Sequence, residues 1–188
     1  MDRRAEGAAE TRDRILRATM ELHFAQGVMA TSHKDVAARA DVSVGTVYHH
    51  FPTTEQLVGA CGAKTFEMFP PPPASVIDAS APFAARILQL TKALVAFYGQ
   101  VPGFTIVRAD RGKLPALDEG IKRFEGAIEA LIRRALGSRS RRRNAVAVVA
   151  ALLDFGVVER LTAAAMPAPE IAATLASITI SWMKGKTT

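Results

Sequence analysis

The residues best suited to chemistry lie between positions 31 and 50, at the expected ends and on the outer face of two short helices. A short second helix that follows a sharp turn is the arrangement that enters the major groove of duplex DNA. Hydroxyl, phenol and imidazole groups donate hydrogen bonds to phosphates, which fix the register of a protein on the duplex. The predicted DNA-contacting residues are Thr31, Ser32, His33, Ser43, Val44, Gly45, Thr46, Tyr48, His49 and His50.

Four of these residues have specific expected roles. Gly45 costs helix stability, and a position without a side chain lets the helix lie close to base edges. Thr46 offers a hydroxyl and a methyl group, which suit a phosphate or the methyl group of thymine. Tyr48 and His49 suit phosphates. His49 and His50 are adjacent in a helix, where neighbouring side chains diverge, so we predict no metal site here.

The two short helices need caps, a turn and an apolar anchor. Ser32 with Asp35 is a capping pair at the start of the first helix, and Ser43 caps the second. Asp41 follows the first helix, where we predict a left-handed backbone conformation that Asp tolerates well. The apolar residues predicted to hold the pair together are Val36, Ala37, Ala40, Val42, Val47 and Phe51.

The remaining chain is helical in pattern, so we predict an all-α fold of about nine helices. The expected helices lie near 11–26, 32–40, 44–50, 54–67, 82–100, 114–136, 146–161 and 171–182, with a short helix or turn within 102–111. Thr11 is the expected cap of the first helix and Gly27 its stop. Four consecutive prolines begin at Pro70 and interrupt the helical pattern. We predict a three-helix head at 1–52, a connecting helix at 53–69, a Pro-rich linker at 70–82 and a larger helical body at 83–188.

The last two expected helices carry more apolar surface than one neighbour can cover. The helix near 146–161 is apolar nearly all round and contains Gly156, which permits close backbone approach. We predict a homodimer through a four-helix bundle, although both helices packing inside the monomer is the alternative. The predicted dimer residues are Val149, Leu152, Leu153, Gly156, Leu175, Ile178 and Trp182.

Aromatic residues distributed along the chain suggest an apolar cavity between the helices of the body. The alternative is that they are plain core residues, which helical spacing favours. The candidate ligand-binding residues are Phe66, Phe69, Phe83, Phe97, Tyr98, Phe104 and Phe124, with Arg108, Asp110 and Arg111 as a polar anchor.

Composition limits the remaining function classes. Of the 188 residues, 49% are hydrophobic and 22% charged, as in ordinary soluble proteins, and no apolar run is long enough to cross a membrane. A single cysteine, Cys61, and no secretion signal predict a cytoplasmic location. All four histidines lie before position 51, so the body has neither His nor Cys and we predict no enzyme, cofactor or metal.

The net charge of +6 gives the predicted DNA surface little support. Residues 1–64 contain eight basic and eight acidic side chains, so the head is formally neutral. The excess is densest at Arg133–Arg134, Arg139 and 141–143, which we interpret as a solvated turn between helices. A second contact with nucleic acid or with an acidic partner is the alternative interpretation.

Over residues 11–66 the chain resembles the TetR family of bacterial regulators. The residues that carry the resemblance are Ile15, Leu16, Ala18, Gly27, Thr31, Asp35, Val36, Ala37, Ala40, Val42, Ser43, Gly45, Thr46, Val47, Tyr48, Phe51, Glu55 and Leu57. The resemblance implies a dimeric, ligand-responsive regulator, most often a repressor, that binds a palindromic operator.

The resemblance also adds Thr54, at the start of the connecting helix, to the DNA-binding residues. The chain departs from the family pattern at Asp41, where relatives commonly have Gly, and at Val44 and Thr54, where they often have Lys. Two charges that neutralise phosphates are therefore missing, which predicts weaker or less salt-sensitive binding. The alternative function is a helical small-molecule-binding protein that has lost DNA binding.

Overall fold

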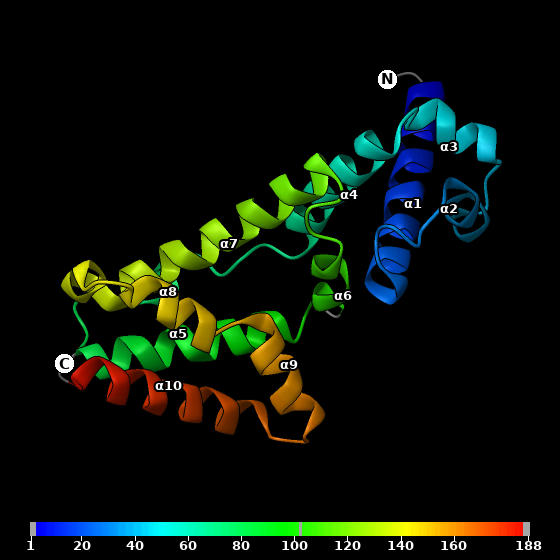
Figure 1. Cartoon of the computed structure of the whole chain (residues 1–188). Coiled ribbons are helices and arrows are strands. Elements are labelled where there is room, and N and C mark those ends of the chain that lie inside the picture. Colours follow the sequence, from blue (N-terminus) through cyan, green and yellow to red (C-terminus); the bar gives the residue numbers. More distant parts are fainter. Residues whose placement is uncertain (1–2, 102, 186–188) are drawn as a thin grey trace. The chain divides into compact units, whose positions relative to one another are not determined.

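The computed structural model describes residues 3–101 and 103–185. These residues form ten α-helices and two short 3₁₀ helices and contain no strand, which confirms the predicted all-α fold (Figure 1). None of the helices in this part of the chain is both long and apolar enough to cross a membrane.

The chain divides into two compact units. Unit 1 comprises the chain up to Pro70 together with Gly103–Arg123, and unit 2 comprises Pro71–Pro102 and the chain from Phe124 onwards. This division differs from the predicted one, because residues 103–123 belong with the head and not with the rest of 83–188. Their helices contact α1 and α4, as described below, and α7 contributes residues to both units.

Unit 1 is built on a long first helix. Its elements are α1 (Arg3–Gln26), α2 (His33–Ala40), α3 (Val44–His50), α4 (Thr54–Met68), α6 (Phe104–Ala109) and the beginning of α7 (Pro115–Leu136). Helix α1 contacts α2, α4 and α6, and α2 contacts α3 (Figure 1). The buried core that joins α1 to α4 includes Ile15, Leu16, Val36, Val47, Phe51, Leu57 and Cys61.

Helix α1 begins at Arg3 and not at Thr11, so the predicted cap at Thr11 is wrong. The Thr11 hydroxyl donates a hydrogen bond of 2.9 Å to the carbonyl oxygen of Gly7, one turn earlier in the same helix. A threonine inside a helix often bonds in this way, and the sequence alone does not distinguish it from a cap. The predicted stop at Gly27 is confirmed, with a left-handed φ of 93°.

Unit 2 contains the remaining helices. They are η1 (Ala74–Val76), α5 (Phe83–Tyr98), the later part of α7, η2 (Gly137–Arg141), α8 (Ala145–Leu152), α9 (Phe155–Ala163) and α10 (Ala168–Lys184). Helices α5 and α10 run side by side, and α8 and α9 also contact α10 (Figure 1).

The predicted single helix near 146–161 is wrong, because the chain breaks between α8 and α9. Asp154 has an extended backbone, and its carboxylate accepts a hydrogen bond of 2.9 Å from the Gly156 amide, which caps α9. The continuous apolar pattern therefore reflects two short helices that bury different faces.

The predicted Pro-rich linker is largely part of unit 2. Ile77 is fully buried, and its carbonyl oxygen accepts a hydrogen bond from Arg134 Nε at 3.1 Å. The Asp78 amide donates to Gln89 Oε1 at 3.0 Å. The prolines end α4, and the chain after them folds onto α5 and α7 because one large apolar side chain anchors it.

Candidate nucleic-acid interface

The first helix of the predicted pair is closed by a reciprocal cap. The Asp35 amide donates to the Ser32 hydroxyl oxygen at 3.2 Å, and the Ser32 amide donates to the Asp35 carboxylate at 2.9 Å. The hydroxyl and amide of Ser32 lower the pKa of Asp35, because both donate to its charged form. The capping pair expected from the sequence is therefore present.

The turn between the helices also follows the prediction. Asp41 is left-handed, with φ 53° and ψ 55°, and its neighbour Val42 donates its amide to the Ala37 carbonyl oxygen at 3.0 Å. The Ser43 hydroxyl then accepts from the Thr46 amide at 3.0 Å and caps α3. Two short helices are thus held at a fixed angle by backbone and cap bonds.

Helix α3 is anchored on one side and exposed on the other. Val47 is fully buried and Phe51 is 2% exposed, so this edge of α3 belongs to the core of unit 1. On the opposite side Val44 is 39% and Tyr48 is 50% exposed. The outward face of α3, defined as Val44, Gly45, Tyr48 and His49, therefore has no covering in this chain.

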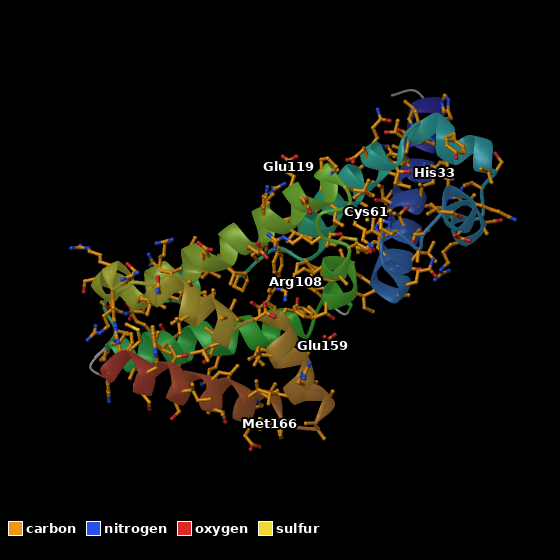
Figure 2. All side chains as sticks on the ribbon, in the orientation of Figure 1. His33, Cys61, Arg108, Glu119, Glu159 and Met166 are labelled. Atoms are coloured by element: carbon orange, nitrogen blue, oxygen red, sulfur yellow. The ribbon has the colours of Figure 1, made fainter. Side chains whose placement is uncertain are left out.

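His33 holds the exposed phenol of Tyr48 in place. The two rings stack with centroids 4.5 Å apart and planes within 6° of parallel. His33, labelled in Figure 2, also has its Nε2 3.3 Å from the carbonyl oxygen of Phe51, so a second contact holds the imidazole. The sequence pattern predicted both residues at the interface but contained no sign of this stacking between α2 and α3.

Packing inside the chain does not require a glycine at position 45. A Cβ atom there would have one near neighbour, Ser43 Oγ, at an ordinary contact distance of 3.7 Å. Glycine in a helix costs about 1 kcal/mol relative to alanine. The structure gives no internal packing benefit that offsets this cost.

The other candidate residues have varied surroundings. The Thr46 hydroxyl lies 2.8 Å from the Ser43 hydroxyl, and Thr54 is exposed at the start of α4. His50 is half-buried, and its pKa is lowered by burial first and by His49 and Arg12 second. Among the described residues no group of three or more His, Cys, Asp or Glu is arranged to hold a metal ion.

Several basic side chains of the head already have partners. Arg17 pairs with Asp13 at 2.7 Å, and Arg39 pairs with Glu21. The Arg12 guanidinium lies over the Phe51 ring, 5.0 Å from its centroid. The formally neutral head therefore offers few uncommitted charges to phosphates, and its geometry supports DNA binding better than its charge does.

A buried histidine and cysteine lie between α1 and α4. No histidine is near Cys61 (labelled in Figure 2) in the sequence, yet His23 Nδ1 lies 3.6 Å from its sulfur. Burial lowers the pKa of His23 to about 4 and raises the pKa of Cys61 to about 12. At neutral pH both groups are uncharged, which makes the thiol a poor nucleophile and supports its interpretation as a core residue.

A seam joins the C-terminal end of α1 to α6, and we define it by Gly27, Met29, Gly103 and Asp110. The Met29 amide donates to the Asp110 carboxylate at 2.9 Å. Gly103 has φ 75°, and a Cβ atom there would lie 2.1 Å from the carbonyl oxygen of Phe24. The two backbones therefore touch directly. In the same unit, the Ala116 amide of α7 donates to Glu55 of α4 at 2.9 Å.

The candidate ligand-binding residues are divided between the units. Unit 1 contains Phe66, Phe69, Phe104, Arg108, Asp110 and Arg111, and unit 2 contains Phe83, Phe97, Tyr98 and Phe124. In unit 2 the Phe97 and Phe124 rings stack at 5.6 Å, and the Tyr98 hydroxyl donates to the Leu153 carbonyl oxygen at 3.1 Å. In unit 1 the Arg123 guanidinium lies 4.5 Å from the centroid of the Phe66 ring.

Three residues predicted for the dimer interface are covered by their own chain. Val149, Leu153 and Leu175 are at most 4% exposed, so they cannot form surface contacts, and the alternative of internal packing is correct for them. Ile178 is 45% exposed. Leu152, Gly156 and Trp182 are half-buried.

A capped pair of short helices, with a sharp turn and an uncovered second helix, defines the class of helix-turn-helix DNA-binding domains. Residues 15–61 match the family described as bacterial regulatory proteins, tetR family. Over this domain the chain is similar to the TetR family, which confirms the resemblance read from the sequence.

Individual relatives agree with this assignment. An HTH-type transcriptional repressor of Mycobacterium tuberculosis is 46% identical over 54 residues, which are 29% of each chain. The chain thus matches less than a third of the length of these curated relatives. A transcriptional regulator from Rhodococcus has the same fold at 19% identity, with a TM-score of 0.71 over 92% of this chain and 95% of its own.

A second solved structure shares the fold and was determined with a small molecule bound. The multidrug-binding protein EbrR, complexed with imidazole, is 20% identical with a TM-score of 0.63 over 95% of this chain and 93% of its own.

Proposed function

We propose that this chain is a ligand-responsive transcriptional repressor that binds a palindromic operator as a homodimer. The observation that carries the proposal is the outward face of α3. Its apolar and aromatic side chains, Val44 and Tyr48, are exposed, and packing inside the chain does not require a glycine at position 45. The phenol of Tyr48 is held in position by His33. A surface built in this way is complementary to a groove and not to the chain's own core.

Direct contacts to DNA fall into two groups in this proposal. Contacts to phosphates position the head and come from side chains that donate hydrogen bonds. These donors are the hydroxyl groups of Thr31, Ser32, Ser43 and Thr54 and the rings of His33, Tyr48, His49 and His50. Val44, Gly45 and Thr46 approach base edges, where an apolar contact with a thymine methyl group carries sequence information.

Dimerisation supplies two heads and offsets the weak electrostatics of each. Ile178 on α10 is the one large apolar side chain of unit 2 that is exposed among the described residues, so it is the best-supported part of the predicted interface. Replacing it by Asp is expected to give a monomer by light scattering. Lys92→Asp, at an exposed position of α5, is the matched control and is expected to leave the dimer intact.

The effector is proposed to be a small apolar or aromatic molecule that contacts the Phe97–Phe124 pair of unit 2. Support comes from these stacked rings and from the small molecule bound by the structural relative EbrR. An effector that binds one state of the dimer better than another shifts the DNA affinity by that difference. Helix α7 contributes residues to both units, and α6 is bonded to the head through the seam.

The proposal is tested by selecting genomic DNA fragments from the source organism with the purified protein. The expected result is one enriched inverted repeat whose half-sites lie about 10 base pairs, or a multiple of this, apart. Enrichment of no motif would favour the second candidate, a small-molecule-binding protein without an operator, which the neutral head supports. Neither candidate involves catalysis or a cofactor.

A further inference from the structure

The excess positive charge of the chain is confined to one segment of unit 2. Six arginines and no acidic residue lie between positions 133 and 143, and the formal net charge of the whole chain is +6. The rest of the chain is therefore formally neutral. We define the arginine turn as Arg133, Arg134, Arg139, Arg141, Arg142 and Arg143, which lie at the end of α7, in η2 and before α8.

Two of these arginines fix the turn against the rest of unit 2. Arg142 donates to the carbonyl oxygens of Met183 and Gly185, at 3.1 and 3.2 Å, at the C-terminal end of α10. Arg134 donates to the carbonyl oxygen of Ile77. Figure 1 shows the turn after α7 at the same end of unit 2 as the C-terminal end of α10. The backbone of the arginine turn is thus held in place, so its remaining side chains project from a fixed base.

The remaining four arginines face the solvent. Arg133, Arg139, Arg141 and Arg143 are exposed, and the Arg139 guanidinium lies over the Phe83 ring at 4.3 Å. Within the described part of the chain, neither Arg141 nor Arg143 has an ion-pair partner. Arg133 has a long contact of 3.5 Å with the exposed Glu129, a pair that contributes little. The positive charge therefore remains available to a partner.

The type of the basic residues indicates the chemistry of that partner. All six are arginine, whose planar guanidinium binds the oxygens of phosphates and of carboxylates with two parallel hydrogen bonds. A membrane surface also presents phosphates, but stable attachment there combines a basic cluster with a second signal, such as apolar side chains that enter the lipid. None of the large apolar residues exposed in the described structure lies in the arginine turn.

We propose that the arginine turn binds the phosphodiester backbone of duplex nucleic acid without regard to sequence, as a contact separate from the head. In this proposal the formally neutral head recognises the base sequence, and the arginines of unit 2 supply the electrostatic attraction to the phosphates. Each phosphate that the turn neutralises releases counterions, so binding weakens as salt rises.

The test uses the full chain and a short duplex of scrambled sequence. Arg133, Arg141 and Arg143 are replaced together by Gln, because none of them holds the backbone of unit 2. The slope of log affinity against log salt is expected to become shallower by about 0.9 for each phosphate that the variant no longer neutralises. The triple Lys variant is expected to keep most of the slope, since it keeps the charges. Arg160→Gln, an exposed arginine of α9, is the matched control and should behave as wild type.

Three outcomes would overturn the proposal. One is a salt slope unchanged by the Gln variant, and another is an equal decrease in the Gln and Lys variants, which would indicate structural damage. The third is weaker binding to anionic vesicles or poly-glutamate with unchanged binding to the duplex. An error in the proposed role of the head would give a different result from an error in the role of the arginine turn. Tyr48→Ala is expected to remove binding to a selected operator, but to leave unchanged the contribution of the arginine turn to binding of the scrambled duplex.

Discussion

The outward face of α3 and the seam between α1 and α6 belong to the same unit, yet they are built in opposite ways. On the outward face, a Cβ atom added at Gly45 meets one distant hydroxyl, and Tyr48 is half-exposed. In the seam, a Cβ atom at Gly103 would overlap a backbone carbonyl. The seam therefore stabilises the fold, whereas the outward face is available to a partner. Substitutions in the two regions should separate stability from DNA binding.

The largest expected effect on stability comes from the seam. Gly103→Ala should destabilise unit 1 by about 3 kcal/mol, because it combines left-handed strain with a clash against the Phe24 carbonyl oxygen. Gly112→Ala is the matched control, since Gly112 also has a positive φ but an added Cβ would have open space. That control should cost about 1 kcal/mol. Equal decreases in stability by urea unfolding would show that the seam is not tightly packed.

Acid should destabilise the region beside the seam through His23. Burial holds its pKa at about 4 in the folded state, below the ordinary value of 6.5. Above that ordinary value both states are neutral, and no stability is lost. As the pH falls below it, the unfolded state binds a proton first, so stability should drop by about 2 kcal/mol between about pH 7 and about pH 5.

The comparison variant for this effect is His23→Gln. Aspartates with lowered pKa values, such as Asp13 and Asp35, also weaken the fold in acid, but they are present in both proteins. The difference between the two pH profiles of unfolding free energy therefore isolates His23. Parallel profiles would mean that the imidazole has the same pKa in the folded and unfolded states.

The smallest expected effect on stability lies on the outward face. Gly45→Ala should raise the unfolding free energy by up to about 1 kcal/mol, because alanine favours the helix and finds space. The same change should weaken binding to the selected operator by roughly tenfold, since the added methyl group holds α3 away from the base edges. If the alanine variant were more stable and bound the operator equally well, the glycine would not be needed for close approach to the base edges.

Local signals predicted the head well. The caps at Ser32 and Ser43 and the left-handed Asp41 depend on side-chain and backbone geometry within a few residues, so the sequence specifies them directly. The same reasoning failed at Thr11, whose hydroxyl bonds within the helix, and at Asp154, whose cap was hidden in a continuous apolar run.

Contacts between distant residues could not be predicted from spacing. The hydrogen bond from Met29 to Asp110 joins residues 81 positions apart, and it assigns α6 to unit 1. The His33–Tyr48 stacking and the His23–Cys61 contact likewise require the packed helices. Periodicity showed that Leu153 and Leu175 are apolar and face a neighbour, but the neighbour proved to be their own chain.

The central claim, that α3 reads DNA, is tested most directly by replacing its exposed phenol. Tyr48→Ala is compared with Met29→Ala, because the two side chains belong to the same unit and are 50% and 51% exposed. Met29 lies outside α3, and its contact in the seam is made by the backbone amide, which the alanine variant keeps. Mobility shifts on the selected operator fragment should be abolished by Tyr48→Ala and unchanged by Met29→Ala, with both proteins still dimeric and equally stable. Normal binding by the Tyr48→Ala protein would contradict the assignment of α3 as the recognition helix.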